Sequence, residues 1–366
     1  MLAMAAAPAD ADSDWRARIA DWQKRIPGIM AEFKVPGLSI AIIRNARIAW
    51  RMGFGVKDVT TKAPVTNDTM FEAASMSKPP FAYMVMKLCE RGVLGLDTPL
   101  TKYTPEKFVE GDSRLDRITP RRVLSHTTGL PNWRSKEEPL QIRSTPGEKF
   151  GYSGEGYDYL QSVVTRLVGR TDSSMCQTFF DGYRLCATDF GEFMGKHLLS
   201  PFGMTSSGYV WKEGFARHMA RPHDKDGKPE EFHKSTAVTV ARYGSAGALL
   251  STPTDYAKFL IEVIDPKPAD ANRLNSASRK EMLRPQVEVP VPSEYGFRAS
   301  WALGWEVLHL KNGDGVIGHG GDNEGFHSLS EVSMTKKSGF VVMTNGENGY
   351  DMIAKRLQFD LIASFV

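Results

Sequence analysis

The chain has 366 residues, and its 46 lysines and arginines against 43 aspartates and glutamates give a formal net charge of only +3. A nearly neutral chain without a long basic run lacks the electrostatic footprint of a nucleic-acid-binding protein, so we predict no nucleic-acid partner. No stretch holds eighteen consecutive apolar residues, and we also predict no membrane span.

Apolar residues recur at helical spacing in several segments of the chain. The first begins at Trp15 and ends at Phe33, shortly before Pro36-Gly37. A second long segment begins directly after a Ser-x-x-Lys sequence. In chain order, the predicted helices are 15–33, 81–94, 118–124, 157–168, 189–199, 254–263, 276–283 and 352–365.

Strand-like runs occupy both ends of the chain. The predicted strands are 38–43, 48–55, 303–308, 315–318, 326–332 and 340–344. Strands at both ends with mostly helices between them predict one sheet built from both chain ends and an inserted helical lobe. We therefore predict a single domain over residues 1–366, with an α/β lobe at about 12–75 and 296–366 and a mainly helical lobe at about 76–295.

Ser75 and Lys78 form a candidate catalytic pair. On a helix, this spacing puts the hydroxyl and the amine on one face, about one turn apart. The free N–H groups and the positive dipole end of the following helix favour a developing oxyanion. Partial burial lowers the pKa of such a lysine, which can then activate the serine as a nucleophile. Because Pro79-Pro80 follows Lys78, we expect a 3₁₀-like first turn.

A second Ser-x-x-Lys sequence runs from Ser333 to Lys336. It lies between two strand-like runs and has no helix after it. We interpret it as a hairpin turn, because this motif needs its structural context to indicate catalysis.

Tyr152 lies in a loop just ahead of a predicted helix. A phenol near a lysine and a serine hydroxyl can shuttle a proton, because the cation favours the tyrosinate. The alternative is a packing residue with a hydrogen-bonded hydroxyl.

A glycine-rich stretch, Gly318-His319-Gly320-Gly321, precedes Asp322. Glycines let a substrate approach the backbone closely, and a strand edge here offers a second N–H donor to an oxyanion. His319 is a candidate hydrogen-bonding partner of the substrate or of the tyrosine. The alternative is a glycine-rich turn with an incidental histidine.

We predict no metal site and no cofactor. His218, His223 and His233 lie in a polar region without the spacing of a zinc site, and we expect His126 to order its loop. The cysteines do not indicate a disulfide scaffold, although Cys176 and Cys186 are close enough in sequence to pair. The N-terminus lacks the basic region of a signal peptide, which favours a cytoplasmic location; a periplasmic or secreted location is the alternative if a signal peptide has been removed.

Three ordered motifs, Ser75-Met-Ser-Lys78, Tyr152-Ser-Gly154 and His319-Gly-Gly321, resemble those of the serine β-lactamase and DD-peptidase superfamily. The resemblance is to class C β-lactamases, D-alanyl-D-alanine carboxypeptidases and, most of all, family VIII carboxylesterases. It runs from about residue 35 to the C-terminus. It includes four framework stretches, 94–99, 123–131, 200–204 and 245–252.

This resemblance implies an α+β fold in which an antiparallel sheet is flanked by N- and C-terminal helices, with an all-helical lobe beside it. It implies that Ser75 is acylated, that Lys78 takes its proton and that Tyr152 relays protons to and from the leaving group. The N–H groups of Ser75 and Asp322 would form the oxyanion hole. His319 would take the place of a lysine or histidine that helps to bind substrate.

The motifs also depart from the pattern. Gly154 stands where many relatives have asparagine, so it offers no side-chain amide to a peptide-like or β-lactam substrate. His319 replaces a lysine and, being largely neutral at pH 7, attracts a substrate carboxylate less. The segment 171–190 is longer than expected and is a candidate cover for the pocket mouth. Trp133 lines the acyl pocket or, equally, anchors a loop in the core.

We predict a serine hydrolase that forms an acyl-enzyme, specifically a carboxylesterase for small esters. One alternative is a β-lactamase or D-amino-acid peptidase with the same machinery. Another is a non-catalytic binding protein of the same fold. The expected partner is thus a small-molecule ester or β-lactam. Neither the natural substrate nor the oligomeric state follows from the sequence.

Overall fold

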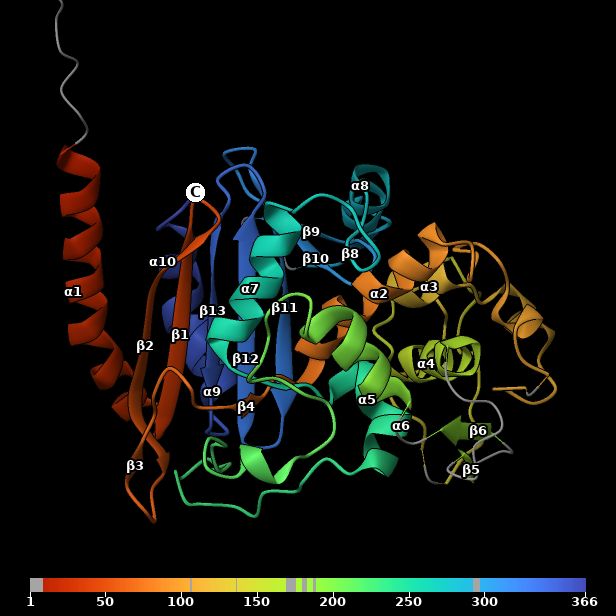
Figure 1. The fold of residues 1–366 in the computed structure, drawn as a ribbon, viewed down its shortest axis with the longest axis horizontal. Coiled ribbons are helices and arrows are strands. Elements are labelled where there is room, and N and C mark those ends of the chain that lie inside the picture. Colours follow the sequence, from red (N-terminus) through yellow and green to blue (C-terminus); the bar gives the residue numbers. More distant parts are fainter. Residues whose placement is uncertain are drawn as a thin grey trace, which may run out of the picture.

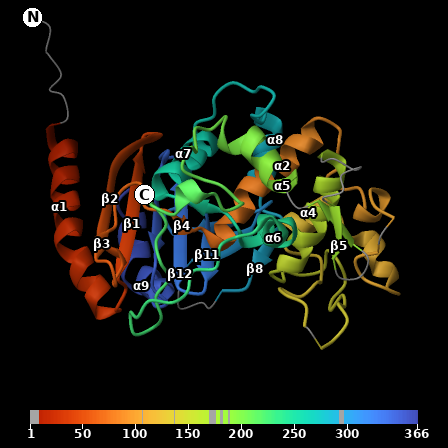
Figure 2. The ribbon, with the colours of Figure 1, turned by 60° about the horizontal axis from the view of Figure 1, so that its bottom comes forward.

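The computed structural model describes residues 9–105, 107–135, 137–168, 176–179, 183–186, 189–291 and 297–366. Figure 1 shows a central sheet whose two faces are covered by helices, with a mostly helical lobe beside it. Figure 2 shows α1 as an outer layer on the side of the sheet away from this lobe. The α+β fold expected from the sequence is confirmed. No helix among the described residues is long and apolar enough to cross a membrane.

Nine antiparallel strands form the main sheet, in the order β3-β2-β1-β13-β12-β11-β10-β9-β8. Strands from the two chain ends pair at its centre, where Ile40 of β1 lies opposite Val342 of β13. The strands are β1 (Gly37–Arg44), β2 (Arg47–Asp58), β3 (Ala63–Pro64), β8 (Val287–Val289), β9 (Arg298–Trp301), β10 (Glu306–His309), β11 (Gly315–Asn323), β12 (Phe326–Ser333) and β13 (Ser338–Thr344). The prediction of one sheet from both chain ends is therefore confirmed.

One predicted strand, 303–308, begins too early, because a turn occupies its first residues and only its second half lies in β10. The chain leaves β9 at Trp301, turns at Gly304 with φ of 84°, and enters β10 at Glu306. Only glycine adopts this left-handed backbone readily. A Cβ at Gly304 would also collide with Ala82 of α2.

The helices of the structure mostly match the predicted segments. They are α1 (Ala9–Glu32), α2 (Lys78–Glu90), α3 (Pro120–Leu124), α4 (Gly154–Val168), α5 (Asp189–Met194), α6 (Ala237–Gly247), α7 (Pro253–Ile264), α8 (Ser276–Leu283), α9 (Gly349–Met352) and α10 (Gln358–Ile362). A π-helical segment, 195–199, continues α5, and another, 353–357, joins α9 to α10. The sequence did not predict α6, which is held against α4 by Gln161. The Gln161 amide donates to the carbonyls of Val240 and Ala241 at 2.8 and 2.7 Å.

Alternation along the central strands divides the core between the two faces of the sheet. Ile40 and Ile42 of β1 face the cluster that contains Trp22 of α1 and Met352 of α9. Ala41 and Ile43 of the same strand face the opposite side of the sheet. They belong to the larger cluster, which continues through α2 and α7 into the helical lobe. This continuity places the start of α2 at the junction of the two lobes.

The structure interleaves the two lobes more than a single insertion at 76–295 would. Helix α7 packs on β1 and β13, and β8 is the outermost strand of the main sheet. Both therefore belong to the sheet layer, because their partners are strands rather than helices.

About half of the segment 171–190 lies within the described residues. Its backbone forms a hairpin of β5 (Cys176–Phe179) and β6 (Tyr183–Cys186), in which Cys176 is opposite Cys186. The side chains of these strands lie outside the described part. The predictions that the two cysteines pair and that this segment covers the pocket mouth therefore stay predictions.

Candidate active site

Ser75 lies in a 3₁₀ turn, Ala74–Ser77, which leads directly into α2 at Lys78. The two prolines that follow occupy the first turn of α2, where a missing N–H costs no hydrogen bond. Ala74 has a φ of 48°, which is strained for a residue with a Cβ. Ser77 holds the turn, because its hydroxyl donates to the Ala74 carbonyl at 2.6 Å and accepts from the Leu249 N–H at 2.9 Å. The expected 3₁₀-like first turn is confirmed.

The Lys78 amine reaches the Ser75 hydroxyl. Its Nζ lies 3.0 Å from Ser75 Oγ and donates to the Ala246 carbonyl at 2.7 Å. The side chain is completely buried, and this desolvation lowers the pKa of Lys78 to about 7, against the opposing charge of Asp158. Near neutral pH, a large fraction of the amine is therefore uncharged and able to accept the Ser75 proton.

Tyr152 contacts both the nucleophile and the lysine. Its phenol hydrogen-bonds with Ser75, and its ring centroid is 4.9 Å from Lys78 Nζ. Burial nevertheless raises the pKa of the phenol well above its ordinary value. The expectation that the lysine favours a tyrosinate is therefore wrong: desolvation outweighs the cation, which itself loses its charge near pH 7. Tyr152 is a neutral phenol that can give a proton and take it back.

His126 holds Tyr152 in place. The two rings lie 4.2 Å apart between centroids, and His126 Nδ1 accepts from the Ser153 N–H at 3.0 Å. Burial lowers the pKa of His126 well below its ordinary value, so the imidazole is neutral. The sequence predicts that His126 orders its own loop, but these side-chain contacts hold a second loop, the one that carries the candidate proton donor.

Strand β11 brings the glycine-rich motif beside the Ser75 turn. A Cβ at Gly321 would collide with the Ala73 carbonyl and with the Ser328 hydroxyl, so only glycine allows this approach. Ser328 ties the two segments together by donating to the Ala73 carbonyl at 3.1 Å. At Gly320 a Cβ would meet only atoms 3.8 Å or more away. The strand therefore runs close enough to the nucleophile for the Asp322 N–H to remain the predicted second oxyanion donor.

The side chains of His319 and Asp322 differ in their surroundings. His319 is buried, its Nδ1 donates to the Gly320 carbonyl at 2.5 Å, and burial lowers its pKa to about 3. His319 thus brings no positive charge to the site. The Asp322 carboxylate is 72% exposed and lies 3.1 Å from His327 Nδ1. Any part that Asp322 plays in catalysis therefore belongs to its backbone.

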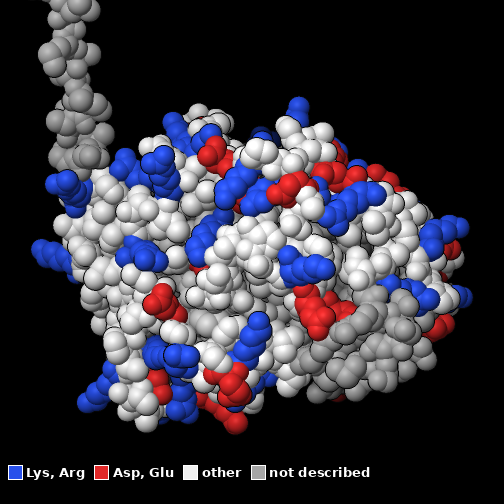
Figure 3. Space-filling model, viewed as in Figure 1, with Lys and Arg blue, Asp and Glu red and all other residues white. Residues whose placement is uncertain are grey.

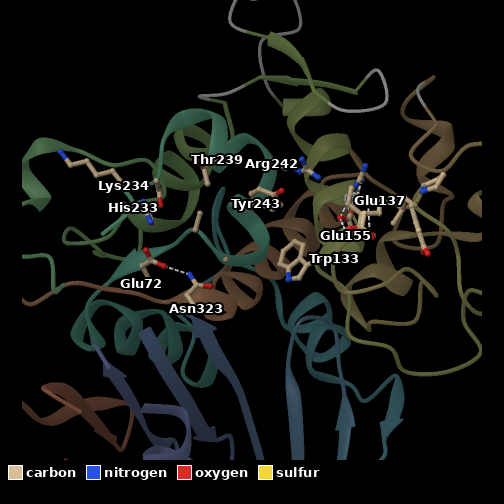
Figure 4. A pocket seen from close by; sticks show the side chains of 18 residues that line it. Glu72, Trp133, Glu137, Glu155, His233, Lys234, Thr239, Arg242, Tyr243 and Asn323 are labelled. Carbon is tan, nitrogen blue, oxygen red and sulfur yellow. Dashed lines mark hydrogen bonds and ion pairs between the residues drawn. The ribbon is translucent and has the colours of Figure 1, made fainter. Parts of the chain in front are cut away.

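Gly154 begins α4 directly beneath the indole of Trp133. A Cβ at Gly154 would lie 2.5 Å from Cη2 of that ring, so a side chain cannot fit there while Trp133 keeps its position. Trp133 also lines a cavity of about 1050 Å³, which Figure 4 shows between the Glu72–Asn323 pair and the aromatic side chains of Trp133 and Tyr243. Glycine at position 154, where many relatives have asparagine, therefore goes together with the indole of Trp133, which fills the space that a side chain would need.

Comparison with known proteins agrees with these motifs. The family model described as Beta-lactamase matches residues 22–363. The chain belongs to the β-lactamase family. Penicillin-binding protein 4 of Amycolatopsis lactamdurans is 27% identical over 89% of this chain and 85% of that protein. Protein flp of Staphylococcus aureus (strain MRSA252) is 21% identical over 86% of this chain, which spans 60% of the length of that relative.

Solved structures of the family share the fold. A class C β-lactamase mutant superposes with a TM-score of 0.74 at 18% identity, covering 98% of this chain and 99% of that one. The D-alanine carboxypeptidase AmpC from Burkholderia cenocepacia gives 0.72 at 19% identity, with 96% and 100% covered. The octameric penicillin-binding protein homologue from Pyrococcus abyssi gives 0.74 at 24% identity, with 93% and 77% covered. Membership of the family supports a serine hydrolase, for which Ser75 and Lys78 are the candidate nucleophile and base.

The second Ser-x-x-Lys sequence of this β-lactamase-family chain is a turn between β12 and β13. The Ser333 hydroxyl accepts from the Lys336 N–H at 3.1 Å and lies 3.0 Å from the Thr335 hydroxyl. The hairpin interpretation is confirmed. Among the histidines of the polar region, His223 binds the Asn345 carbonyl at 2.8 Å. In the described ranges, no three His, Cys, Asp or Glu side chains are grouped to hold a metal ion.

Sequence reasoning missed three contributors to the site. These are the Ala246 carbonyl that orients Lys78, the contact of His126 with Tyr152, and a link between Glu72 and Asn323. Asn323 lies two residues after the glycine-rich motif, and this position is its signal in the sequence. No pattern in the sequence indicates that Asn323 binds Glu72, which lies 251 residues earlier.

The Glu72–Asn323 link predicts a positioning effect. Asn323 Nδ2 donates to Glu72 Oε2 at 2.5 Å and so joins β4 (Phe71–Glu72), just before the Ser75 turn, to the end of β11 after Asp322. These segments carry the two predicted oxyanion donors. We expect Asn323→Ala to lower kcat about tenfold with little change in KM, because small misplacements of donors weaken transition-state binding.

Glu72→Gln keeps an acceptor for Asn323 and serves as the matched control. Steady-state kinetics should find kcat of this variant within about threefold of wild type, because one neutral hydrogen bond replaces a charged one. A lower melting temperature in Asn323→Ala with unchanged kcat would show that the link serves only the fold.

Proposed function

We propose that this chain is a carboxylesterase that hydrolyses small esters through an acyl-enzyme on Ser75. The observation that carries the chemistry is the fully buried Lys78 amine, 3.0 Å from Ser75 Oγ and with a pKa of about 7. A neutral lysine in contact with a serine hydroxyl is an activated nucleophile–base pair.

The reaction begins when Lys78 takes the Ser75 proton and Oγ attacks the ester carbonyl. The negative charge on the carbonyl oxygen is stabilised by N–H donors, for which those of Ser75 and Asp322 are proposed. The neutral Tyr152 phenol gives its proton to the departing alcohol, and the lysine ammonium restores the phenol. A water molecule then attacks the acyl-enzyme, and the same groups return the proton to Ser75 in reverse order.

Two features favour an ester over an amide or a β-lactam. Trp133 covers Gly154, so no side-chain amide is available there to bind a substrate amide. His319 is neutral because burial lowers its pKa to about 3, so it does not attract the carboxylate common to penicillins and D-peptides. An ester needs neither group and has a better leaving group than an amide.

A β-lactamase or D-amino-acid peptidase remains the second candidate. It is favoured by the family itself and by relatives whose names describe a penicillin-binding protein and a D-alanine carboxypeptidase. The third candidate, a non-catalytic binding protein, is less favoured, because a buried lysine with its pKa lowered to about 7 is costly unless its neutral form is used.

The deciding experiment compares p-nitrophenyl butyrate with a chromogenic cephalosporin as substrates of wild type, Ser75→Ala and Ser333→Ala. Ser333→Ala is the matched control, because it removes the serine of the second Ser-x-x-Lys sequence. We expect ester turnover that disappears in Ser75→Ala, survives in Ser333→Ala and far exceeds cephalosporin turnover. Comparable cephalosporin turnover would establish the second candidate. No turnover that depends on Ser75 with either substrate, or with D-amino-acid amides, would favour the third.

A further inference from the structure

The cavity beside the nucleophile is larger than a short ester requires. Its volume is about 1050 Å³, at the upper end of the range in which proteins bind drug-sized ligands. Glu72, Asn323 and Gly247 line it. They lie within three residues of Ser75, of Asp322 and of the Ala246 carbonyl that binds Lys78, respectively. The cavity therefore reaches segments that adjoin the proposed nucleophile, although Ser75 itself is not among the described residues that line it.

Trp133 is held over Gly154 by hydrogen bonds between two chain segments. The Asn132 carbonyl accepts from the N–H groups of Gly154 and Glu155, each at 3.0 Å, and the Asn132 side chain also accepts from the Gly154 N–H at 3.0 Å. The Ser153 hydroxyl also donates to the carbonyl of Pro131, the residue before Asn132, at 2.8 Å. These bonds fix the backbone on which the indole stands.

A buried ion pair fixes the far side of the same contact. Arg134 Nε and a terminal guanidinium nitrogen donate to Glu155 Oε2 at 2.9 and 2.7 Å, and the Arg134 N–H donates to Oε1 at 2.9 Å. The Glu155 side chain is only 1% exposed. Because Trp133 and Gly154 directly precede this pair, removing either charge would leave the other buried beside the indole. The ring is thus preorganised rather than free to swing.

Trp133 and Tyr243 form one wall of the cavity. Their ring centroids lie 5.5 Å apart with an angle of 82° between the planes, which is a favourable edge-to-face arrangement. Figure 4 shows both rings on the side of the cavity opposite the Glu72–Asn323 pair. Trp133 is 46% exposed, although large aromatic side chains are usually mostly buried. A rigid, exposed indole completed by a second ring is suited to binding a flat apolar group.

The surroundings of Tyr152 indicate which part of an ester this wall meets. Tyr152, the proposed proton donor to the departing alcohol, packs against Trp301 and His319. None of these three is among the described residues that line the cavity. Ser75 is not among them either, so the lining alone does not orient the ester. We place the alcohol beside Tyr152, its proposed proton donor, and the acyl group toward the Trp133–Tyr243 wall, because these are different sets of residues.

We propose that the Trp133–Tyr243 wall binds an aromatic ring in the acyl group, so that the substrates of this site are esters of aryl-substituted carboxylic acids. This inference rests on the proposed esterase function. It specifies which class of ester the indole over Gly154 would bind.

The test uses p-nitrophenyl esters that share one leaving group and differ in the acyl group: butyrate, phenylacetate and cyclohexylacetate. We expect kcat/KM for phenylacetate to be about tenfold higher than kcat/KM for butyrate. It should also be about threefold higher than kcat/KM for cyclohexylacetate, because contact between aromatic rings adds to simple area burial. Trp133→Ala should lower kcat/KM for phenylacetate by about tenfold more than kcat/KM for butyrate, and so remove the preference, because the butyryl chain makes less contact with the wall.

Three further variants keep the test decisive. Trp133→Phe should retain part of the preference, and Tyr243→Ala should reduce it without touching Gly154. Phe359→Ala is the matched control, because Phe359 is 48% exposed on α10 and does not line the cavity. A loss of preference in Tyr243→Ala supports the inference even if Trp133→Ala does not fold.

The inference fails if wild type hydrolyses the three acyl esters equally, or if Trp133→Ala lowers kcat/KM for all of them by one factor. It also fails if the aromatic preference follows the alcohol, as a comparison of benzyl butyrate with butyl butyrate would reveal. Each of these results leaves the Ser75-dependent hydrolysis of butyrate by wild type intact. The failure of this inference is thereby distinguished from failure of the esterase function.

Discussion

Replacement of Lys78 by methionine should lower kcat/KM for an ester by about a thousandfold or more, because the variant has no base within reach of Ser75. Methionine fills a similar volume, and the side chain it replaces is completely buried. We therefore expect the variant to fold. Hydrolysis of p-nitrophenyl butyrate measures the first effect, and urea unfolding measures the stability.

The pH dependence follows from the lowered pKa of Lys78. Below pH 7, kcat/KM of wild type should rise about tenfold per pH unit, as the neutral amine becomes more abundant, and it should level off above about pH 8. Tyr152 adds no alkaline decline below pH 10, because burial raises its pKa. A flat profile between pH 5 and 8 would contradict the assignment of Lys78 as the base.

The same pKa predicts how stability changes. Lys78 has a pKa of about 7 in the folded protein and about 10.4 in an unfolded chain, so the unfolded state binds more protons between these values. The cost of burying Lys78 is therefore greatest at and below pH 7 and disappears as the pH approaches 10.4. We expect Lys78→Met to be more stable than wild type by about 2 kcal/mol at pH 7, after allowing for the unpaired Ala246 carbonyl, and to lose this advantage near pH 10.

Lys87→Met is the matched control for both measurements. Lys87 is also buried on α2, but it pairs with Glu90 at 2.5 Å and binds the Arg273 carbonyl at 2.8 Å. Its replacement should leave the activity unchanged and decrease the stability, because a charged partner is left alone. Parallel stability curves for wild type and Lys78→Met across pH 7–10 would show that Lys78 is not neutral in the folded protein.

Features that depend on a few neighbouring residues could be predicted from the sequence. The helix that follows Ser75 is predicted by its apolar spacing, and the hairpin at Ser333 by the strand-like runs on either side. The nearly neutral charge also matches the surface, where Figure 3 shows acidic and basic side chains mixed over one face. Each of these is decided by local chemistry.

Features that depend on distant partners could not be predicted. Helix α6 contains two glycines and is held by Gln161, about 80 residues away. The protonation of Tyr152 depends on burial by other segments, and this burial outweighs the nearby lysine. Likewise, Gly154 could be recognised as a departure from the family motif. That Trp133 occupies the space above it required the fold.

Replacement of Tyr152 by phenylalanine should affect alkyl esters much more than activated esters. The variant loses the proton donor to the departing alcohol, a contribution typically worth 10²–10⁴-fold. An alkoxide needs that proton, whereas p-nitrophenolate leaves without it. We therefore expect kcat/KM to fall about a thousandfold for ethyl butyrate and about tenfold for p-nitrophenyl butyrate.

Tyr157→Phe is the matched control for this prediction. Tyr157 is also buried beside the lysine, with its ring centroid 5.4 Å from Lys78 Nζ, but its hydroxyl has no hydrogen-bond partner among the described residues. Its loss should change neither ester by more than about threefold. If Tyr152→Phe instead slows both esters equally, Tyr152 acts on the nucleophile rather than on the leaving group. The direction in which the alcohol departs, and with it the placing of the acyl group against Trp133, would then have to be reversed.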